Sequence, residues 1–196
     1  MGIRRGSIST PIIADGLIFN MDAANRASYV PESIKSYNTT NLSQTGSLQD
    51  TGMFSAYSKG VWVFDGIDDG IAFNSTSNLG TTSTVSMWIK RADPTNVVDG
   101  LFGNNANAWQ AAMYINAESR IYISLSKWVK PFFYSANLFD TTDWFNLVII
   151  RTGDTADLYF NGVWKDDLTG LGAGDTLIDS IGYNSADNQD YYNGEI

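Results

Sequence analysis

The sequence predicts an all-β protein, built as an antiparallel sandwich or barrel. Short runs rich in β-forming residues follow one another along the chain, with Gly, Asn and Asp between them. Apolar and polar residues alternate with a period of two: Ile121, Ile123 and Leu125 share one face of the run at residues 120–126. No segment shows the 3.6-residue periodicity that is typical of an amphipathic helix.

The predicted strands are bounded by turn-forming residues and are rich in Val, Ile, Phe, Tyr and Trp. An irregular arm, residues 1–13, precedes a first strand at residues 15–22, and residues 23–58 are expected to be a long polar loop that carries short strands. No linker divides the rest, so residues 14–196 are expected to form one domain. Its further strands are expected at residues 61–64, 71–73, 84–90, 98–102, 109–115, 120–126, 132–134, 144–151, 156–160, 177–183 and 191–196.

Two places predict hairpins in particular. Apolar runs at residues 144–150 and 158–160 flank a Gly/Asp/Thr turn, and Asn161-Gly162 then reverses the chain again. Asn-Gly is a strong signal for a two-residue hairpin turn. The turn at residues 116–119 is expected to join the strands on either side of it as an antiparallel hairpin.

Composition excludes several functions. The net charge is −9 with 12 Lys and Arg in 196 residues, and we find no basic stripe of the kind that binds nucleic acid. The acidic surface also disfavours an anionic membrane, and no apolar run approaches the length of a membrane span. The chain has no Cys and no His, so it can form no disulfide and lacks the usual general base and the commonest transition-metal ligand.

The order "Trp, apolar strand, Arg, turn, Leu-Tyr-Phe-Asn-Gly" in residues 144–162 resembles the laminin G-like, or concanavalin A-like, jelly-roll family. Four further segments match this family in order, at residues 15–30, 61–73, 84–90 and 181–196. The resemblance implies a two-sheet antiparallel jelly-roll sandwich, and it suggests binding rather than chemistry. It names no ligand.

The resemblance also bears on the two ends of the sequence. In this family the Gly-x-Ile element, here residues 194–196, leads into a final strand, so the closing strand is expected to be shortened, truncated or supplied by a neighbouring chain. The opening block, residues 15–30, resembles structural proteins of tailed phages. That likeness suggests a non-catalytic virion protein, a capsid decoration or fibre component that works as a homo-oligomer. An extracellular, lectin-like carbohydrate-binding module is the alternative.

A glycosidase is the enzyme hypothesis, because glucanases share this fold. Retaining glycosidases need two carboxylates about 5–5.5 Å apart. The three glutamates of the chain, Glu32, Glu118 and Glu195, lie far apart in sequence, and the strand at residues 156–160 carries the single carboxylate of Asp157. The sequence therefore predicts a protein that is not an enzyme.

A calcium site is the second candidate. Asp65, Asp68 and Asp69 lie in one tight Asp-Gly turn, and clustered carboxylate oxygens suit Ca²⁺. The alternative, which we favour, is a structural turn, because Asp bonds its own backbone and Gly accepts positive φ.

A carbohydrate site is the third candidate. Trp109 and Trp128 lie beside polar loop residues, and with Tyr134 they are the candidates for stacking on sugar rings. Packing in the core or at its rim is the alternative for each tryptophan. We expect it for the three that fall within apolar strands: Trp62, Trp88 and Trp144.

The arm is the last candidate. Arg4 and Arg5 with Ile12 and Ile13 could anchor the domain to an acidic partner surface, and a frayed terminus is the equal alternative.

Overall fold

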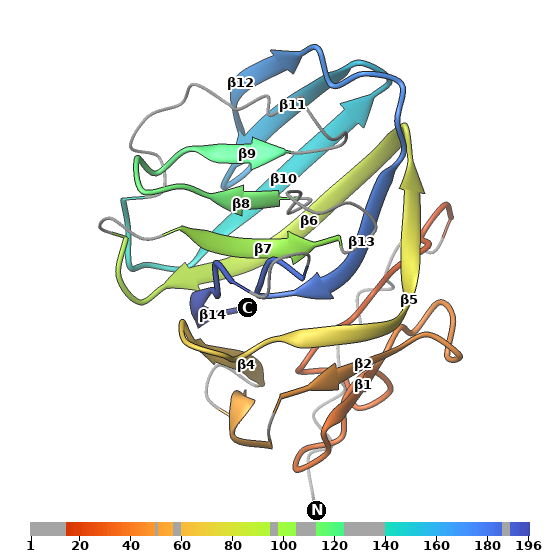
Figure 1. The fold of residues 1–196 in the computed structure, drawn as a ribbon, viewed down its shortest axis with the longest axis vertical. Coiled ribbons are helices and arrows are strands. Elements are labelled where there is room, and N and C mark those ends of the chain that lie inside the picture. Colours follow the sequence, from red (N-terminus) through yellow and green to blue (C-terminus); the bar gives the residue numbers. More distant parts are fainter. Residues whose placement is uncertain are drawn as a thin grey trace, which may run out of the picture.

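A computed structural model of the chain describes residues 15–49, 51–56, 60–94, 98–104, 113–123, 140–185 and 189–196. The expected arm, its boundary with the domain and the strand expected at residues 132–134 lie outside these residues. The described part is a sandwich of two antiparallel sheets with seven strands each (Figure 1), as the sequence predicts. In this part of the chain, no helix has the length and apolar character that a membrane span requires.

The strands of the first sheet follow the spatial order β1 (Lys35–Tyr37), β2 (Thr45–Leu48), β5 (Ile71–Gly80), β13 (Thr176–Ile181), β7 (Asp99–Gly103), β8 (Met113–Ile115) and β9 (Ile121–Ile123). Those of the second sheet follow the order β12 (Val163–Thr169), β11 (Thr155–Phe160), β10 (Phe145–Thr152), β6 (Thr82–Arg91), β14 (Asn193–Glu195), β4 (Val61–Asp65) and β3 (Phe54–Ser55). A short 3₁₀ turn at Thr51–Met53 precedes β3.

The predicted hairpins are confirmed. β10 pairs with β11, β11 with β12, and β8 with β9, all antiparallel. Asn161 and Gly162 have φ of 51° and 77°, the two positive values that a type I′ turn requires. This turn sets the register of β12 on β11.

The core lies between the two sheets and follows the predicted alternation. On β10, Phe145, Leu147 and Ile149 are buried, whereas the residues between them are partly exposed. Ile115 and Ile121 of the first sheet are fully buried in the same apolar cluster. Burying such side chains contributes about 1.5–3 kcal/mol each, so the alternating faces hold the two sheets together.

The strand expected at residues 15–22 is not formed. This segment is held by single side-chain and backbone hydrogen bonds rather than by a strand ladder: the Asn20 N–H donates to Asn38 Oδ1 at 3.0 Å, and the Asn20 carbonyl accepts from the Thr39 N–H at 2.9 Å. The Phe19 ring lies 5.1 Å from that of Phe73 on β5. The segment is therefore attached to the first sheet without being one of its strands.

The last strand lies inside the second sheet. β14 pairs with β4 on one side and with the end of β6 on the other (Figure 1). Only glycine fits at position 194, where φ is 152°, because a Cβ atom there would clash with the Lys90 carbonyl oxygen. The last described residue, Ile196, also exchanges backbone hydrogen bonds of 2.9 Å with Trp62.

A fully buried ion pair links the two sheets beside β14. Arg91, the last residue of β6, donates through Nε to Asp99 Oδ2 at 2.7 Å, and both side chains are 0% exposed. The other carboxylate oxygen of Asp99 accepts the backbone N–H of Asn193 at 3.1 Å. Burial raises the pKa of the Asp99 carboxyl, and the Arg91 guanidinium opposes that effect.

We predict that Asp99→Asn lowers the free energy of unfolding by about 3–5 kcal/mol, because it leaves a buried guanidinium without its countercharge. Glu195→Gln is the matched control, since it breaks the partly exposed Lys90–Glu195 pair and should cost about 1 kcal/mol or less. Urea unfolding followed by tryptophan fluorescence measures both. Equal, small losses for the two variants would show that the buried pair does not hold the sheets together.

Candidate functional site

Four neighbouring strands of the second sheet, β6, β10, β11 and β12, turn one face to the core and the other to solvent. Met87 and Ile89 of β6 are buried, while Trp88 between them is 60% exposed. On β12, Trp164 is 52% exposed. Exposed tryptophans on a regular strand gain nothing from core packing, so they mark the outer face as a candidate binding surface.

The strand register brings these aromatic side chains together. Val148 on β10 lies opposite Tyr159 on β11, and Tyr159 lies opposite Trp164 on β12. Trp88 lies opposite Asn146 of β10, which is two residues from Val148 and on the same face of the strand. Neighbouring strands are about 4.8 Å apart, so the surface from β6 to β12 spans roughly 14 Å.

Polar groups accompany the rings. Trp164 Nε1 donates to Asp157 Oδ1 at 3.1 Å, which holds the indole against the sheet. Asn146 Nδ2 donates to the Met87 carbonyl at 3.1 Å. We call this set the aromatic face; it comprises Trp88, Asn146, Val148, Asp157, Tyr159 and Trp164.

One pair of carboxylates lies at the margin of the aromatic face. Asp157 on β11 is directly opposite Asp167 on β12, where Cβ atoms are about 4.5–5.5 Å apart. Asp167 is exposed on the edge strand, and Asp157 accepts the indole N–H. Glu195 and Glu118 do not join them, because Glu195 pairs with Lys90 and Glu118 with Arg120. Neither carboxylate of the pair is buried. Their environments therefore do not differ in the way that distinguishes the general acid of a glycosidase from its nucleophile.

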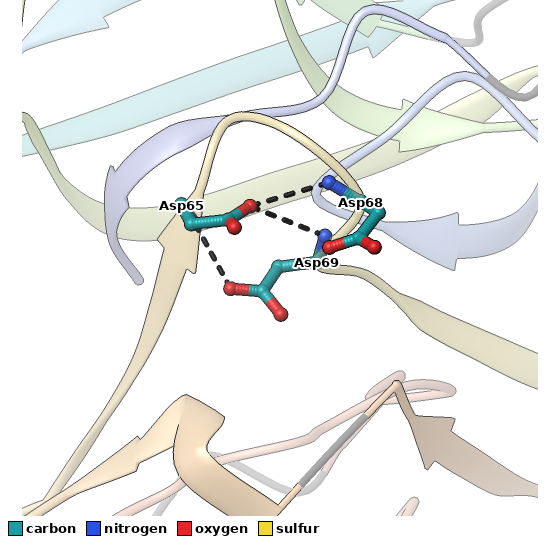
Figure 2. A group of neighbouring side chains, drawn as sticks. All are labelled: Asp65, Asp68 and Asp69. Atoms are coloured by element: carbon teal, nitrogen blue, oxygen red, sulfur yellow. Dashed lines mark hydrogen bonds between the residues drawn. The ribbon is translucent and has the colours of Figure 1, made fainter.

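The acidic turn, Asp65, Asp68 and Asp69, joins β4 to β5. Their carboxylates offer three ligand atoms within 4.8 Å of one another, so they could hold a metal ion. Figure 2 shows that they also bond the backbone of the turn itself. Asp65 Oδ1 accepts the N–H groups of Asp68 and Asp69 at 3.2 and 3.4 Å, and Asp69 Oδ2 accepts the Asp65 N–H at 2.9 Å.

These hydrogen bonds favour the charged form of Asp65. The backbone N–H of Ile67 donates to its Oδ1 at 2.7 Å, and this bond, first among several, lowers the pKa of Asp65. An ionised carboxylate suits a hard cation. These hydrogen bonds also form the structural turn that the sequence predicts, and they occupy the Oδ1 atom of Asp65.

The structure places some of the predicted site residues and not others. Seven lie outside the described residues, so their roles stay predictions: Arg4, Arg5, Ile12, Ile13, Trp109, Trp128 and Tyr134. Trp62 is 2% exposed and belongs to the core, as expected. The expectation that Trp88 is a core residue is wrong. Its signal was present in the sequence, since Trp88 shares the polar parity of Ser86 rather than that of Met87.

The model of one protein family, described as the concanavalin A-like lectin/glucanases superfamily, matches residues 65–196, which is more than half of the chain. Among curated proteins, none matches the sequence.

Proposed function

The chain belongs to the concanavalin A-like lectin/glucanases superfamily, and we propose that it is a non-catalytic recognition domain that binds carbohydrate on the aromatic face. The observation that carries this proposal is the register that brings Trp164 and Tyr159 side by side, with Trp88 on the same exposed face.

The chemistry of the aromatic face supports a sugar ligand. The face of an aromatic ring carries partial negative charge, which attracts the polarised C–H groups of a sugar ring. The Asn146 amide and the Asp157 carboxylate add polar groups beside the rings. A broad, open surface of this kind suits an extended glycan better than a small molecule, because small ligands prefer enclosed pockets.

The carboxylates support binding without turnover. Asp157 and Asp167 form a cross-strand pair at the margin of the aromatic face. Asp157 accepts the indole N–H of Trp164, Asp167 is exposed to solvent, and neither lies in a buried, apolar environment. A general acid for glycoside cleavage needs such an environment to keep its proton near neutral pH.

We propose that this domain works in a virus particle, as a capsid decoration or fibre component that assembles as a homo-oligomer. The support is the resemblance of residues 15–30 to structural proteins of tailed phages. The arm adds an apolar and cationic segment, with Arg4, Arg5, Ile12 and Ile13, that suits contact with an acidic protein neighbour. An extracellular lectin is the alternative location.

Calcium is the ion that we propose for the acidic turn. All its ligand atoms are carboxylate oxygens, and Asp65 is held in its charged form by backbone N–H groups. Bound calcium would fix the β4–β5 connection.

We predict that Trp88→Ala and Trp164→Ala each weaken glycan binding by about tenfold or more, which corresponds to about 1.4 kcal/mol per ring. A glycan array identifies the ligand, and calorimetry measures its affinity. Val163→Ala is the matched control, because Val163 is the neighbour of Trp164, is similarly exposed and has the opposite parity on β12.

Loss of glycan binding on Trp109→Ala or Trp128→Ala instead would move the site to the loops. Release of reducing ends from the bound glycan, abolished by Asp157→Asn, would contradict a non-catalytic role.

We predict that calcium raises the melting temperature and that a chelator reverses this, because an ion that binds only the folded state stabilises it by about 2.7 kcal/mol at 100 times its Kd. Asp65→Asn should abolish the shift while its amide oxygen keeps the turn. Asp143→Asn, an exposed aspartate outside the turn, is the control. A melting temperature that does not respond to calcium would leave the turn a purely structural one.

We predict that the chain co-sediments with a large particle, in stoichiometric amount, when its native source is fractionated on a density gradient and analysed by mass spectrometry. Deletion of residues 1–13 should release it from the particle if the arm is the anchor. Recovery only as a small free species would contradict the virion proposal and leave the glycan-binding role standing.

A further inference from the structure

Two rows of side chains cross the outer face of β11 and β12. Tyr159 lies opposite Trp164 in the aromatic row, and Asp157 lies opposite Asp167 in the carboxylate row. Tyr159 and Asp157 are two residues apart on β11, so about 6.5 Å separates the two rows. The register shift between Leu158 and Tyr159 adds one residue to β12, which brings Trp164 and Asp167 to the same face. The strand register therefore places paired negative charge directly beside paired aromatic rings.

The charge of the carboxylate row has no counterpart among the described residues. Like charges directly opposite each other on neighbouring strands destabilise a sheet. In the described part of the chain, neither Asp157 nor Asp167 belongs to an ion pair, and the nearby Lys165 of β12 pairs with neither of them. Asp157 accepts only the neutral indole N–H of Trp164, at 3.1 Å. A cation from outside would therefore relieve a repulsion that these residues leave in place.

The aromatic row favours the same kind of ligand group. A cation within about 6 Å of a tryptophan or tyrosine ring is attracted by the negative face of the ring, and tryptophan attracts it most strongly. The Trp164 side chain is 52% exposed, and its indole is held in place by the hydrogen bond to Asp157. The rings and the carboxylates therefore act together on a cationic group bound between the two rows.

Hydroxyl groups follow the carboxylate row on the same face. Thr155 lies opposite Thr169, two residues beyond Asp157 and Asp167, and both threonines are exposed. The Thr155 hydroxyl donates to the Thr152 carbonyl at 3.0 Å, and the oxygen of such a hydroxyl still accepts hydrogen bonds. Over about 13 Å the face therefore offers aromatic rings, then negative charge, then hydroxyl groups. A sugar ring with an amino group and hydroxyl groups matches this order.

We propose that the aromatic face selects a cationic glycan, one whose sugars carry free amino groups; this inference rests on the proposed glycan-binding function and names its ligand class. The ring of one sugar stacks on Trp164 and Tyr159, and its ammonium group lies between Asp157 and Asp167. An ammonium group has three N–H donors, enough to bond both carboxylates at once. The N-acetylated form of the same sugar has lost this charge, so it leaves the two carboxylates without a cation.

Two oligosaccharides of equal length test this proposal on the full chain. The first is a chitosan oligosaccharide, whose sugars carry free amines, and the second is the N-acetylated chitin oligosaccharide. Calorimetry in a mildly acidic buffer, in which amines are protonated and aspartates are ionised, compares their affinities. We expect chitosan to bind about tenfold more tightly in about 0.01 M salt. The preference should disappear in about 1 M salt, where the Debye length falls from about 30 Å to about 3 Å.

Variants separate the charge from the rings. Asp167→Asn should reduce the preference for chitosan over chitin about threefold to fivefold. It also removes the cross-strand repulsion, so it should not lower the melting temperature. Asp143→Asn is the matched control, because it removes the same charge from an exposed position outside the aromatic face, and it should leave the preference unchanged. Trp164→Ala should weaken the binding of both oligosaccharides.

Three results would overturn the inference. One is equal or weaker binding of chitosan than of chitin or of a neutral array glycan; if Trp164→Ala still weakens that binding, the glycan-binding function stands. Another is a preference for chitosan that Asp167→Asn and Asp143→Asn change alike, since it would then come from the net charge alone. The third is an oligolysine that binds as tightly as chitosan and is unaffected by Trp164→Ala, which would assign the carboxylates to a cationic polypeptide. Failure of every glycan to bind would contradict the proposed function, and this inference with it.

Discussion

The buried ion pair between Arg91 and Asp99 is the interaction on which the arrangement of the two sheets depends. Arg91 ends β6 in the second sheet, and Asp99 begins β7 in the first. A buried pair overcomes its desolvation cost only when its remaining polar atoms are also bonded. Here the second oxygen of Asp99 accepts the Asn193 N–H, so the same pair positions the start of β14 between β4 and β6.

A second buried arginine holds the other end of β6 in a different way. Arg151, which lies opposite Ser83 in the ladder, donates to three backbone carbonyls, those of Gly80, Gly153 and Gly172, at 2.9–3.2 Å. It also donates to Thr176 Oγ1 at 2.9 Å. Burial lowers the pKa of this guanidinium. Its hydrogen-bond partners are neutral carbonyl and hydroxyl groups rather than a carboxylate. It therefore fastens three turns to one strand without a second buried charge.

The sequence predicts the local structure well and the long-range structure poorly. Period-two alternation and Asn161-Gly162 locate the hairpins, because both signals act over a few residues. The opposition of Asp157 and Asp167 depends on the register of β12, which a bulge shifts, and no local pattern reports it. The apolar character of its strand predicts that Trp88 lies in the core, although its parity indicates the outer face. The attachment of residues 15–22 by the Asn38 side chain, likewise, replaces a ladder that β-propensity alone would predict.

Strand β6 contributes to the core and to the aromatic face because the side chains of a strand alternate between its two faces. Its odd-numbered side chains, Val85, Met87 and Ile89, face the core, and the even-numbered Trp88 belongs to the aromatic face. Arg91, the last residue of the same strand, makes the buried ion pair with Asp99. Core packing, the proposed recognition surface and the link between the two sheets therefore all depend on the position of one strand.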